Sequence, residues 1–333
     1  MADGRFLVIR LGSLGDIVHT LPAAAALRDS FPEARIHWVV ERKWAPLLEG
    51  NPDLSRVIAL DRDSWAALAS CVRKIRAARY TCAIDFQGLY KSALLGFLSG
   101  ARQRVGFDRR MAREAAAAFF YTHRAFPTSR HKVDHNLALA EMAGAQPGAY
   151  RFPVRVPAEA EVEMAQRLAS TGLSEFFVVS PGGGWRSKCW PAERYAELCR
   201  ELERRHGWRA VVNFGPRETE LAEAVCRGAA PARAVLLPTD VPQLMALLAR
   251  ASLVVAGDTG PLHLAVALGT PVVGLYGPTD PTRNGPFSTA EVVVRNAQTN
   301  ETTYKRGSEY SAAMLSISVE QVVAAVERRL GMA

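Results

Sequence analysis

The sequence has few cysteines and no pattern that would join them into a framework. Its five cysteines, at positions 71, 82, 189, 199 and 226, are an odd number and include no C-x-x-C pair. This excludes a disulfide framework and a structural zinc site as organising features. We expect reduced, mostly buried thiols and no bound metal.

Long apolar runs are also missing. No run approaches the ~18 residues that a membrane-spanning helix needs. The first apolar run, residues 6–9, meets a charge at Arg10, too early for the core of a signal peptide, so a cytoplasmic protein is expected. With 49% hydrophobic and 22% charged residues, the 333-residue chain has a globular composition. Its length predicts about two domains.

Acidic residues are scarce in one half of the chain. Residues 1–150 hold 21 Lys and Arg against 14 Asp and Glu, a net charge of +7. The remaining 20 basic and 19 acidic residues give residues 151–333 a net charge of only +1. Eight basic residues lie within 102–132, opposed only by Asp108 and Glu114. Such a cluster is either a solvated basic face or a surface for nucleic acid, an anionic membrane or an acidic substrate.

Short apolar runs alternate with stretches of helical spacing, and the alternation occurs twice. Strands are predicted at 6–11, 36–40, 56–60 and 82–85, and again at 176–180, 209–214, near 235, at 253–256 and at 271–276. A proline-containing stretch at 146–157 separates the two series. The pattern predicts an α/β protein with two doubly wound, Rossmann-like domains at 1–150 and 158–317 that face a central cleft. A final helix within 318–333 is able to pack back on the N-terminal domain.

The first glycine loop, residues 11–22, joins the first strand to a helix but is not the G-x-G-x-x-G dinucleotide motif. That helix is expected over residues 16–30, so Asp16 falls at its start. It is either a helix N-cap or a carboxylate placed to accept a proton, and its position in the sequence favours neither role over the other. The neighbouring His19 is expected to be a satisfied, half-buried side chain.

Two further loops in the second half have the chemistry of a diphosphate site. One carries a glycine triplet at 182–184 followed by Lys188, which supplies a point charge. The other, residues 257–260, brings Thr259 and a helix N-terminus, with His263 one turn later. Glu218 lies where a strand meets a helix. Its carboxylate either accepts hydrogen bonds from ribose hydroxyls or stabilises the first turn of the helix through its negative charge.

Five segments follow one another along nearly the whole chain: GSLGDIVHTLP (12–22), DFQGLYKS (85–92), SKCWP (187–191), GDTGPLHLA (257–265) and YGPTDP (276–281). Together and in this order they resemble glycosyltransferase family 9. The resemblance implies a GT-B fold and an inverting, metal-independent heptosyltransferase without a cofactor, active in lipopolysaccharide biosynthesis. The implied donor is ADP-heptose, and the implied acceptor is the Kdo of Kdo2-lipid A or another anionic lipopolysaccharide precursor. Contact with the inner face of the cytoplasmic membrane, and none with nucleic acid, is expected.

The resemblance also implies roles for individual residues. Asp16 matches the catalytic base and Lys188 matches the lysine that holds the donor diphosphate. The remaining donor-binding positions are Gly183, Gly184, Glu218, Asp258, Thr259, Gly260 and His263. On the acceptor side, Arg113 matches a family arginine, and Gly15, Arg109 and Arg110 are candidates beside it. The family's cysteines after the last strand have no counterpart here.

Four other interpretations compete with this one. A family 9 enzyme with another heptose or sugar substrate differs only in specificity. A nucleotide-sugar epimerase would leave the basic first domain unexplained, because it needs no acceptor site. A nucleic-acid-binding protein would leave the glycine loops without a role and lacks a supporting motif. A NAD-dependent dehydrogenase is disfavoured by the missing G-x-G-x-x-G.

Overall fold

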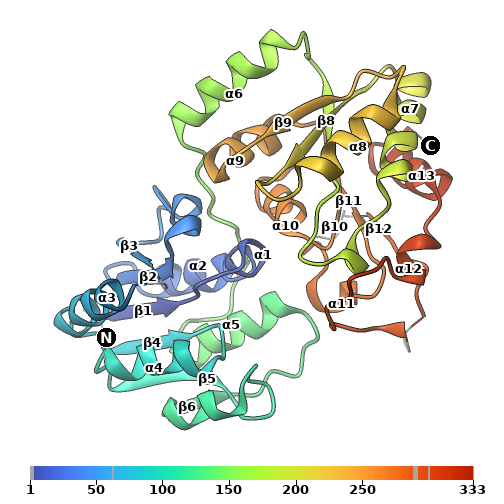
Figure 1. Cartoon of the computed structure of the whole chain (residues 1–333). Coiled ribbons are helices and arrows are strands. Elements are labelled where there is room, and N and C mark those ends of the chain that lie inside the picture. Colours follow the sequence, from blue (N-terminus) through green and yellow to red (C-terminus); the bar gives the residue numbers. More distant parts are fainter. Residues whose placement is uncertain (1–3, 62–63, 288–291, 299–300, 333) are drawn as a thin grey trace. The chain divides into compact units, whose positions relative to one another are not determined.

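The computed structural model describes residues 4–61, 64–287, 292–298 and 301–332. The chain forms two compact units, residues 1–155 and 156–333, which divide inside the proline-containing stretch 146–157 (Figure 1). Each unit is built around its own six-stranded parallel sheet. Each has the Rossmann-like α/β class that the sequence predicts.

The first unit has the strand order β3-β2-β1-β4-β5-β6. The strands are β1 (Arg5–Ile9), β2 (Arg35–Glu41), β3 (Arg56–Leu60), β4 (Cys82–Asp85), β5 (Gln103–Phe107) and β6 (His123–Ala125). Since the direction of winding reverses between β1 and β4, the loops that leave these two neighbouring strands border the crevice where such sheets bind ligands.

Helices cover both faces of this first sheet. They are α1 (Leu14–Val18), α2 (Leu21–Ser30), η1 (Arg42–Leu47), α3 (Trp65–Ala77), α4 (Tyr90–Leu98), η2 (Ala115–Phe120) and α5 (Lys132–Met142). Leu7 and Ile9 of β1 share a buried cluster with side chains of α3 and α4. Phe6 points to the other face, where its ring meets Phe31 at the end of α2. This alternation is the period of two expected of a strand buried on both sides.

The second unit repeats the same winding, with the order β12-β11-β10-β7-β8-β9. Its strands are β7 (Phe176–Ser180), β8 (Arg209–Phe214), β9 (Val235–Pro238), β10 (Leu253–Gly257), β11 (Val272–Leu275) and β12 (Val292–Val294). Its helices are α6 (Ala158–Ser170), η3 (Arg186–Lys188), α7 (Ala192–His206), α8 (Thr219–Ala229), α9 (Val241–Arg250), α10 (Gly260–Ala267), α11 (Pro281–Asn284), α12 (Ala312–Leu315) and α13 (Val319–Arg329). Here β7 and β10 are the neighbours at the reversal, so their loops border the crevice.

The structure differs from the sequence-based element assignment in several places. The single helix expected at 16–30 is two helices, α1 and α2, with Pro22 in the first turn of α2. The basic segment 102–132 contains β5 and β6, whose frequent charges hid the strand pattern. The last helix, α13, belongs to the second unit, because its apolar face joins the core beside α7, β11 and β12.

Candidate functional site

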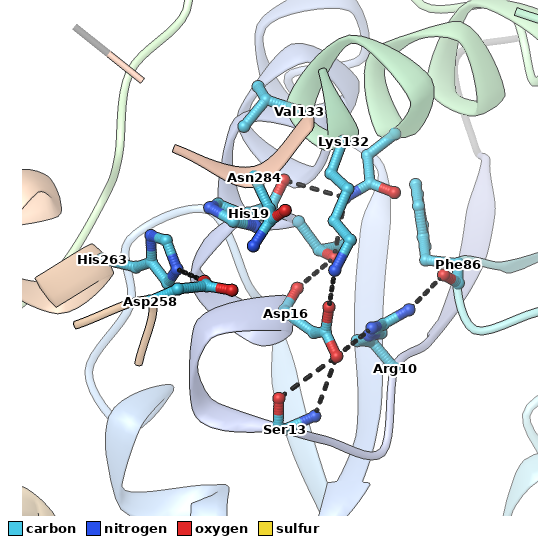
Figure 2. Close-up of polar contacts among 12 residues, drawn as sticks. Arg10, Ser13, Asp16, His19, Phe86, Lys132, Val133, Asp258, His263 and Asn284 are labelled. Atoms are coloured by element: carbon cyan, nitrogen blue, oxygen red, sulfur yellow. Dashed lines mark hydrogen bonds and ion pairs between the residues drawn. The ribbon is translucent and has the colours of Figure 1, made fainter. Parts of the chain in front are cut away.

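In the first unit, the Asp16 carboxylate is the centre of a charged cluster. Its Oδ2 atom lies 2.7 Å from Arg10 Nη2, and its Oδ1 atom lies 3.1 Å from Lys132 Nζ. Ser13 Oγ also donates to Oδ2 at 3.1 Å (Figure 2). Arg10 follows β1, Asp16 lies in α1, and Lys132 begins α5, so three segments converge on one carboxylate.

These partners decide the protonation state of Asp16. Burial by itself raises the pKa of the carboxyl, but the positive charges of Arg10 and Lys132, with a smaller contribution from His19, lower it more. The net pKa therefore lies well below the usual value. At neutral pH the carboxylate is ionised and can accept a proton, although its basicity is low.

The loop after β4 braces the loop that carries Asp16. Gln87 Oε1 accepts a hydrogen bond from the Leu11 backbone N–H at 2.9 Å, and the carbonyl of Phe86 accepts one from the Arg10 guanidinium. Asp85, fully buried, holds this brace by accepting from the backbone of Gln87 at 2.8 Å. The DFQGLYKS segment therefore fixes the position of Arg10, which in turn pairs with Asp16.

The arginines predicted on the acceptor side lie in the turn at 108–114, which rests on the β4 loop. The Glu114 backbone N–H donates to the Gly88 carbonyl at 2.9 Å. Arg109 and Arg113 are exposed on this turn. Arg110 is already engaged, since its Nε lies 2.9 Å from Asp108 Oδ1 and its guanidinium lies 4.1 Å from the centre of the Phe126 ring.

In the second unit, Lys188 and Asp258 form a buried ion pair. Lys188 Nζ lies 2.6 Å from Asp258 Oδ2, with the two side chains 10% and 6% exposed. His263 Nε2, from α10, lies 3.3 Å from the other carboxylate oxygen of Asp258 (Figure 2). The lysine ammonium also lies 4.5 Å from the centre of the Trp185 ring. A cation is thus held at the crevice edge by the loops that follow β7 and β10.

Glycines allow these two loops to approach closely. A Cβ atom at Gly257 would lie 3.0 Å from the Lys188 carbonyl oxygen, and one at Gly183 would lie 3.0 Å from Cys189 Sγ and 3.8 Å from Thr259 Cγ2. Thr259 occupies the N-cap position of α10, which begins at Gly260. The structure therefore brings the predicted donor residues of both loops to one edge of the sheet, where a helix N-terminus favours an anion.

Glu218 lies on the neighbouring loop after β8. Its Oε2 atom accepts from the Gly215 backbone N–H at 3.0 Å, and its carboxylate rests on the Cα of Gly182, where a Cβ would lie only 2.0 Å from Oε1. Beside it is a cavity of about 310 Å³. The cavity is lined by Arg167, Phe214, Gly215, Pro216, Pro238, Thr239, Asp240 and Gln243.

Sequence reasoning missed two partners of Asp16 and the cavity. Arg10 had a signal, because a lone arginine directly after a buried strand must find a partner for its charge. Lys132 was counted only as one of the basic residues of 102–132, and nothing in the sequence links it to Asp16. The cavity depends on side chains from α6, β8, β9 and α9, which come together only in the folded unit.

The described parts of the chain hold neither a metal-binding cluster nor a helix that could span a membrane. Among residues 4–61, 64–287, 292–298 and 301–332, no group of three or more His, Cys, Asp and Glu side chains is arranged to hold a metal ion. In the same residues, no helix has the length and apolar content required to cross a membrane.

Comparison with known proteins identifies the family. Residues 68–313 match the model of "Glycosyltransferase family 9 (heptosyltransferase)". Lipopolysaccharide heptosyltransferase 1 of Pseudomonas aeruginosa is 32% identical over 86% of this chain and 82% of its own length. The protein of that name from Escherichia coli K12 is 31% identical over 89% of this chain and 95% of its own.

A solved structure, E. coli heptosyltransferase WaaC with ADP, matches with a TM-score of 0.75 and 27% identity, and the match covers 99% of each chain. This likeness and the two six-stranded sheets confirm the predicted GT-B fold class. The family match extends over most of the chain and includes the loops of Lys188, Glu218 and Asp258. The chain therefore belongs to glycosyltransferase family 9, the heptosyltransferases.

Proposed function

We propose that this heptosyltransferase moves L-glycero-D-manno-heptose from ADP-heptose to the Kdo residue of Kdo2-lipid A with inversion at the anomeric carbon. The observation that carries the proposal is the pair of opposite charge centres at the crevice edges of the two sheets. One is the ionised Asp16 carboxylate, and the other is the Lys188 cation. Inverting transfer needs both, a proton acceptor for the attacking hydroxyl and a positive charge for the departing diphosphate.

On the donor side, the diphosphate would lie against Lys188 and the N-terminus of α10. The amides of Gly183, Gly184 and Gly260, with the hydroxyl of Thr259, supply hydrogen bonds to its oxygens. Glu218 is placed to accept from ribose hydroxyls, and the cavity beside it has the apolar wall that an adenine ring would need. The E. coli relative whose structure contains ADP supports this donor class.

On the acceptor side, a Kdo hydroxyl attacks the anomeric carbon of heptose. The new C–O bond forms as the bond to the diphosphate breaks, the hydroxyl proton passes to Asp16, and ADP leaves with the bonding electron pair. Because the pKa of Asp16 is low, the proton transfers late, after the new bond has made the hydroxyl acidic. Lys188 and the loop amides stabilise the charge that develops on ADP without a metal.

The acceptor assignment follows from charge and from relatives. Exposed Arg109 and Arg113, together with Gly15 beside Asp16, lie on the strongly basic half of the chain, which suits the carboxylates and phosphates of Kdo2-lipid A. Both curated relatives above carry the name heptosyltransferase 1. A family 9 enzyme that places heptose at another inner-core position is the second candidate. We propose a cytoplasmic enzyme that meets its acceptor at the inner membrane face.

The deciding experiment measures ADP release from ADP-heptose with and without Kdo2-lipid A. Wild type should release ADP only with the acceptor. Asp16→Ala should reduce kcat by about 10²–10⁴-fold, because general-base catalysis contributes that range, while leaving donor affinity unchanged. Asp134→Asn, a carboxylate in the first turn of α5 with no role here, is the matched control and should behave as wild type.

Each other result has a definite meaning. Release that survives Asp16→Ala would remove Asp16 as the base. Release that depends on a heptosylated acceptor in place of Kdo2-lipid A would favour the second candidate. Absence of release with both acceptors would contradict the ADP-heptose assignment.

A further inference from the structure

The first unit exposes a cluster of aromatic side chains that the proposed chemistry does not use. Phe119 of η2 is 78% exposed, and Phe97 and Tyr90 of α4 are 50% and 47% exposed. The half-buried Phe120 joins them, with its ring centre 5.2 Å from that of Tyr90 and 5.7 Å from that of Phe97. We call these four residues the aromatic patch. Phe119 belongs to η2, which packs against α4, and exposed apolar side chains gathered on neighbouring helices can mark an interaction site.

The aromatic patch is built on a rigid base. The buried Tyr121, which follows η2, donates from its hydroxyl to Asp85 Oδ2 at 2.6 Å. Its ring packs where a Cβ at Gly106 would come within 2.3 Å, so β5 is shaped around it. Arg104 of β5 donates from Nε to the Phe120 carbonyl at 2.7 Å. The contacts of Tyr121 and Arg104 therefore fix the segment 115–120 on β5, while the side chain of Phe119 is exposed to solvent.

Basic residues lie close to the aromatic patch in the chain, and one of them contacts it. Lys91 adjoins Tyr90 in α4, Arg102 follows the end of α4, and both are exposed. The guanidinium of Arg104 lies 5.5 Å from the centre of the Phe97 ring. Glu114, an acid next to the patch, accepts a hydrogen bond from the Tyr90 backbone N–H at 2.6 Å. We call Lys91, Arg102 and Arg104 the basic rim.

We infer that the aromatic patch and basic rim dock on an anionic lipid surface, with Phe119 inserted among the headgroups. Aromatic rings favour the membrane–water interface, and neighbouring cations are attracted to anionic headgroups. Pairing of two copies through this patch would bring like-charged rims together, which charge complementarity disfavours. The inference rests on the proposed function, since a lipid-anchored acceptor is what would make such docking useful.

The test measures binding of the full chain to phosphatidylcholine vesicles with and without added phosphatidylglycerol, in the absence of donor and acceptor. Wild type should bind the anionic vesicles far better than the neutral ones. Phe119→Ser should weaken this binding by about tenfold, because a large apolar side chain leaves the interface. Lys91→Ala and Arg102→Ala should each weaken it by roughly fivefold and reduce its salt dependence. Val162→Ser removes an exposed apolar side chain from α6 of the second unit and should change nothing.

Kinetics separate docking from catalysis. With acceptor embedded in vesicles, Phe119→Ser should raise KM by about tenfold, whereas kcat and KM with a lipid-free, water-soluble Kdo acceptor should stay at wild-type values. If the vesicle effect holds but no heptose is transferred, the inference stands and the proposed function fails. Equal vesicle binding by wild type and Phe119→Ser overturns the inference. So does a wild-type dimer that Phe119→Ser converts to a monomer, because the patch would then be a contact between copies.

Discussion

The two units use the same sheet topology but arrange their charges in opposite ways. In the first unit, the loop after the first strand carries the carboxylate, Asp16, and two cations converge on it. In the second unit, the corresponding loop carries the cation, Lys188, and the carboxylate Asp258 comes from the loop after β10. Both centres lie at the reversal of strand order, where neighbouring loops meet.

The difference shows how one topology serves two chemical tasks. The first centre has more positive than negative charge around one carboxylate, so the carboxylate stays ionised but only weakly basic. In the second centre a single lysine is balanced by a single buried carboxylate, which positions the ammonium without removing its charge. The first arrangement suits a proton acceptor and the second suits an anion site. Four predictions test this division.

The largest effect is expected for Lys188→Met. Loss of the cation should lower kcat/KM by about 10²–10³-fold, the range for removing one group that stabilises a developing negative charge. The variant should also melt at a lower temperature, because breaking a buried ion pair on one side costs about 3–5 kcal/mol. Steady-state kinetics and calorimetry measure the two effects separately.

A double variant sharpens this prediction. Lys188→Met combined with Asp258→Asn removes the unpaired buried carboxylate and should recover much of the lost stability without recovering activity. Lys43→Met, an exposed lysine of the first unit, is the control for loss of a positive charge. Activity restored by the double variant would mean that Lys188 acts only by neutralising Asp258.

The next effect is a shift of the pH profile in Lys132→Met. Removing this cation raises the pKa of Asp16, because the charge of Lys132 helps to keep that pKa low. The acid limb of the kcat/KM profile should therefore move to higher pH. Lys132→Arg keeps the charge and should leave the limb in place. An unmoved limb in Lys132→Met would mean that another group titrates there.

A smaller effect is expected on acid stability. The pKa of Asp16 is lower in the folded than in the unfolded chain, so its contribution is present above the unfolded pKa of about 3.9 and is lost as pH falls through the folded pKa. Asp16→Asn should thus lower the melting temperature by several degrees at neutral pH and progressively less below about pH 4. Calorimetry over a pH series tests this. A difference in melting temperature between wild type and Asp16→Asn that grows toward acid pH would contradict the prediction.

The smallest effect is expected for Gly182→Ala. The added methyl group would overlap the Glu218 carboxylate, which can rotate away at little cost to folding but would lose its hydrogen bond from Gly215. The melting temperature should change little, while KM for the donor should rise by about three- to tenfold, the loss of one hydrogen bond. Gly148→Ala, where a Cβ meets no atom within 4 Å, is the control. An unchanged KM for the donor would mean that Glu218 does not take part in donor binding.

The two series of strands followed from the sequence because most are apolar runs bounded by glycine or proline. β3, β4, β7 and β8 have the residues expected. β5, β6 and β12 were not predicted, and in β5 and β6 the polar side chains of Gln103, Arg104, His123 and Arg124 interrupt the apolar pattern. β6 is the edge strand and pairs with β5, whereas β5 lies between β4 and β6, so it is this pairing in the folded sheet that shows both segments to be strands.

At the site, local spacing identified the loops but not all of the contacts. Asp16, Lys188 and Asp258 each stand at a strand-to-helix junction, which the order of glycines and apolar runs reveals. Whether Asp16 is a helix cap or a charged centre could not be decided in this way. In the structure Ser13, not Asp16, is the N-cap of α1. Asp16 is the third residue of the helix, where its Oδ2 accepts from the Ser13 backbone N–H at 3.4 Å and pairs with Arg10.

The sequence by itself determined the two α/β units, the positions of their glycine loops and the excess of positive charge in the first half, because these depend on local pattern and composition. Only the tertiary structure decided which charges meet. Lys132 reaches Asp16 across 116 positions of the chain, and Lys188 reaches Asp258 across a strand pair. The reason is physical: a carboxylate's pKa and a cation's orientation depend on atoms within a few ångströms, and the folded sheet alone sets those distances.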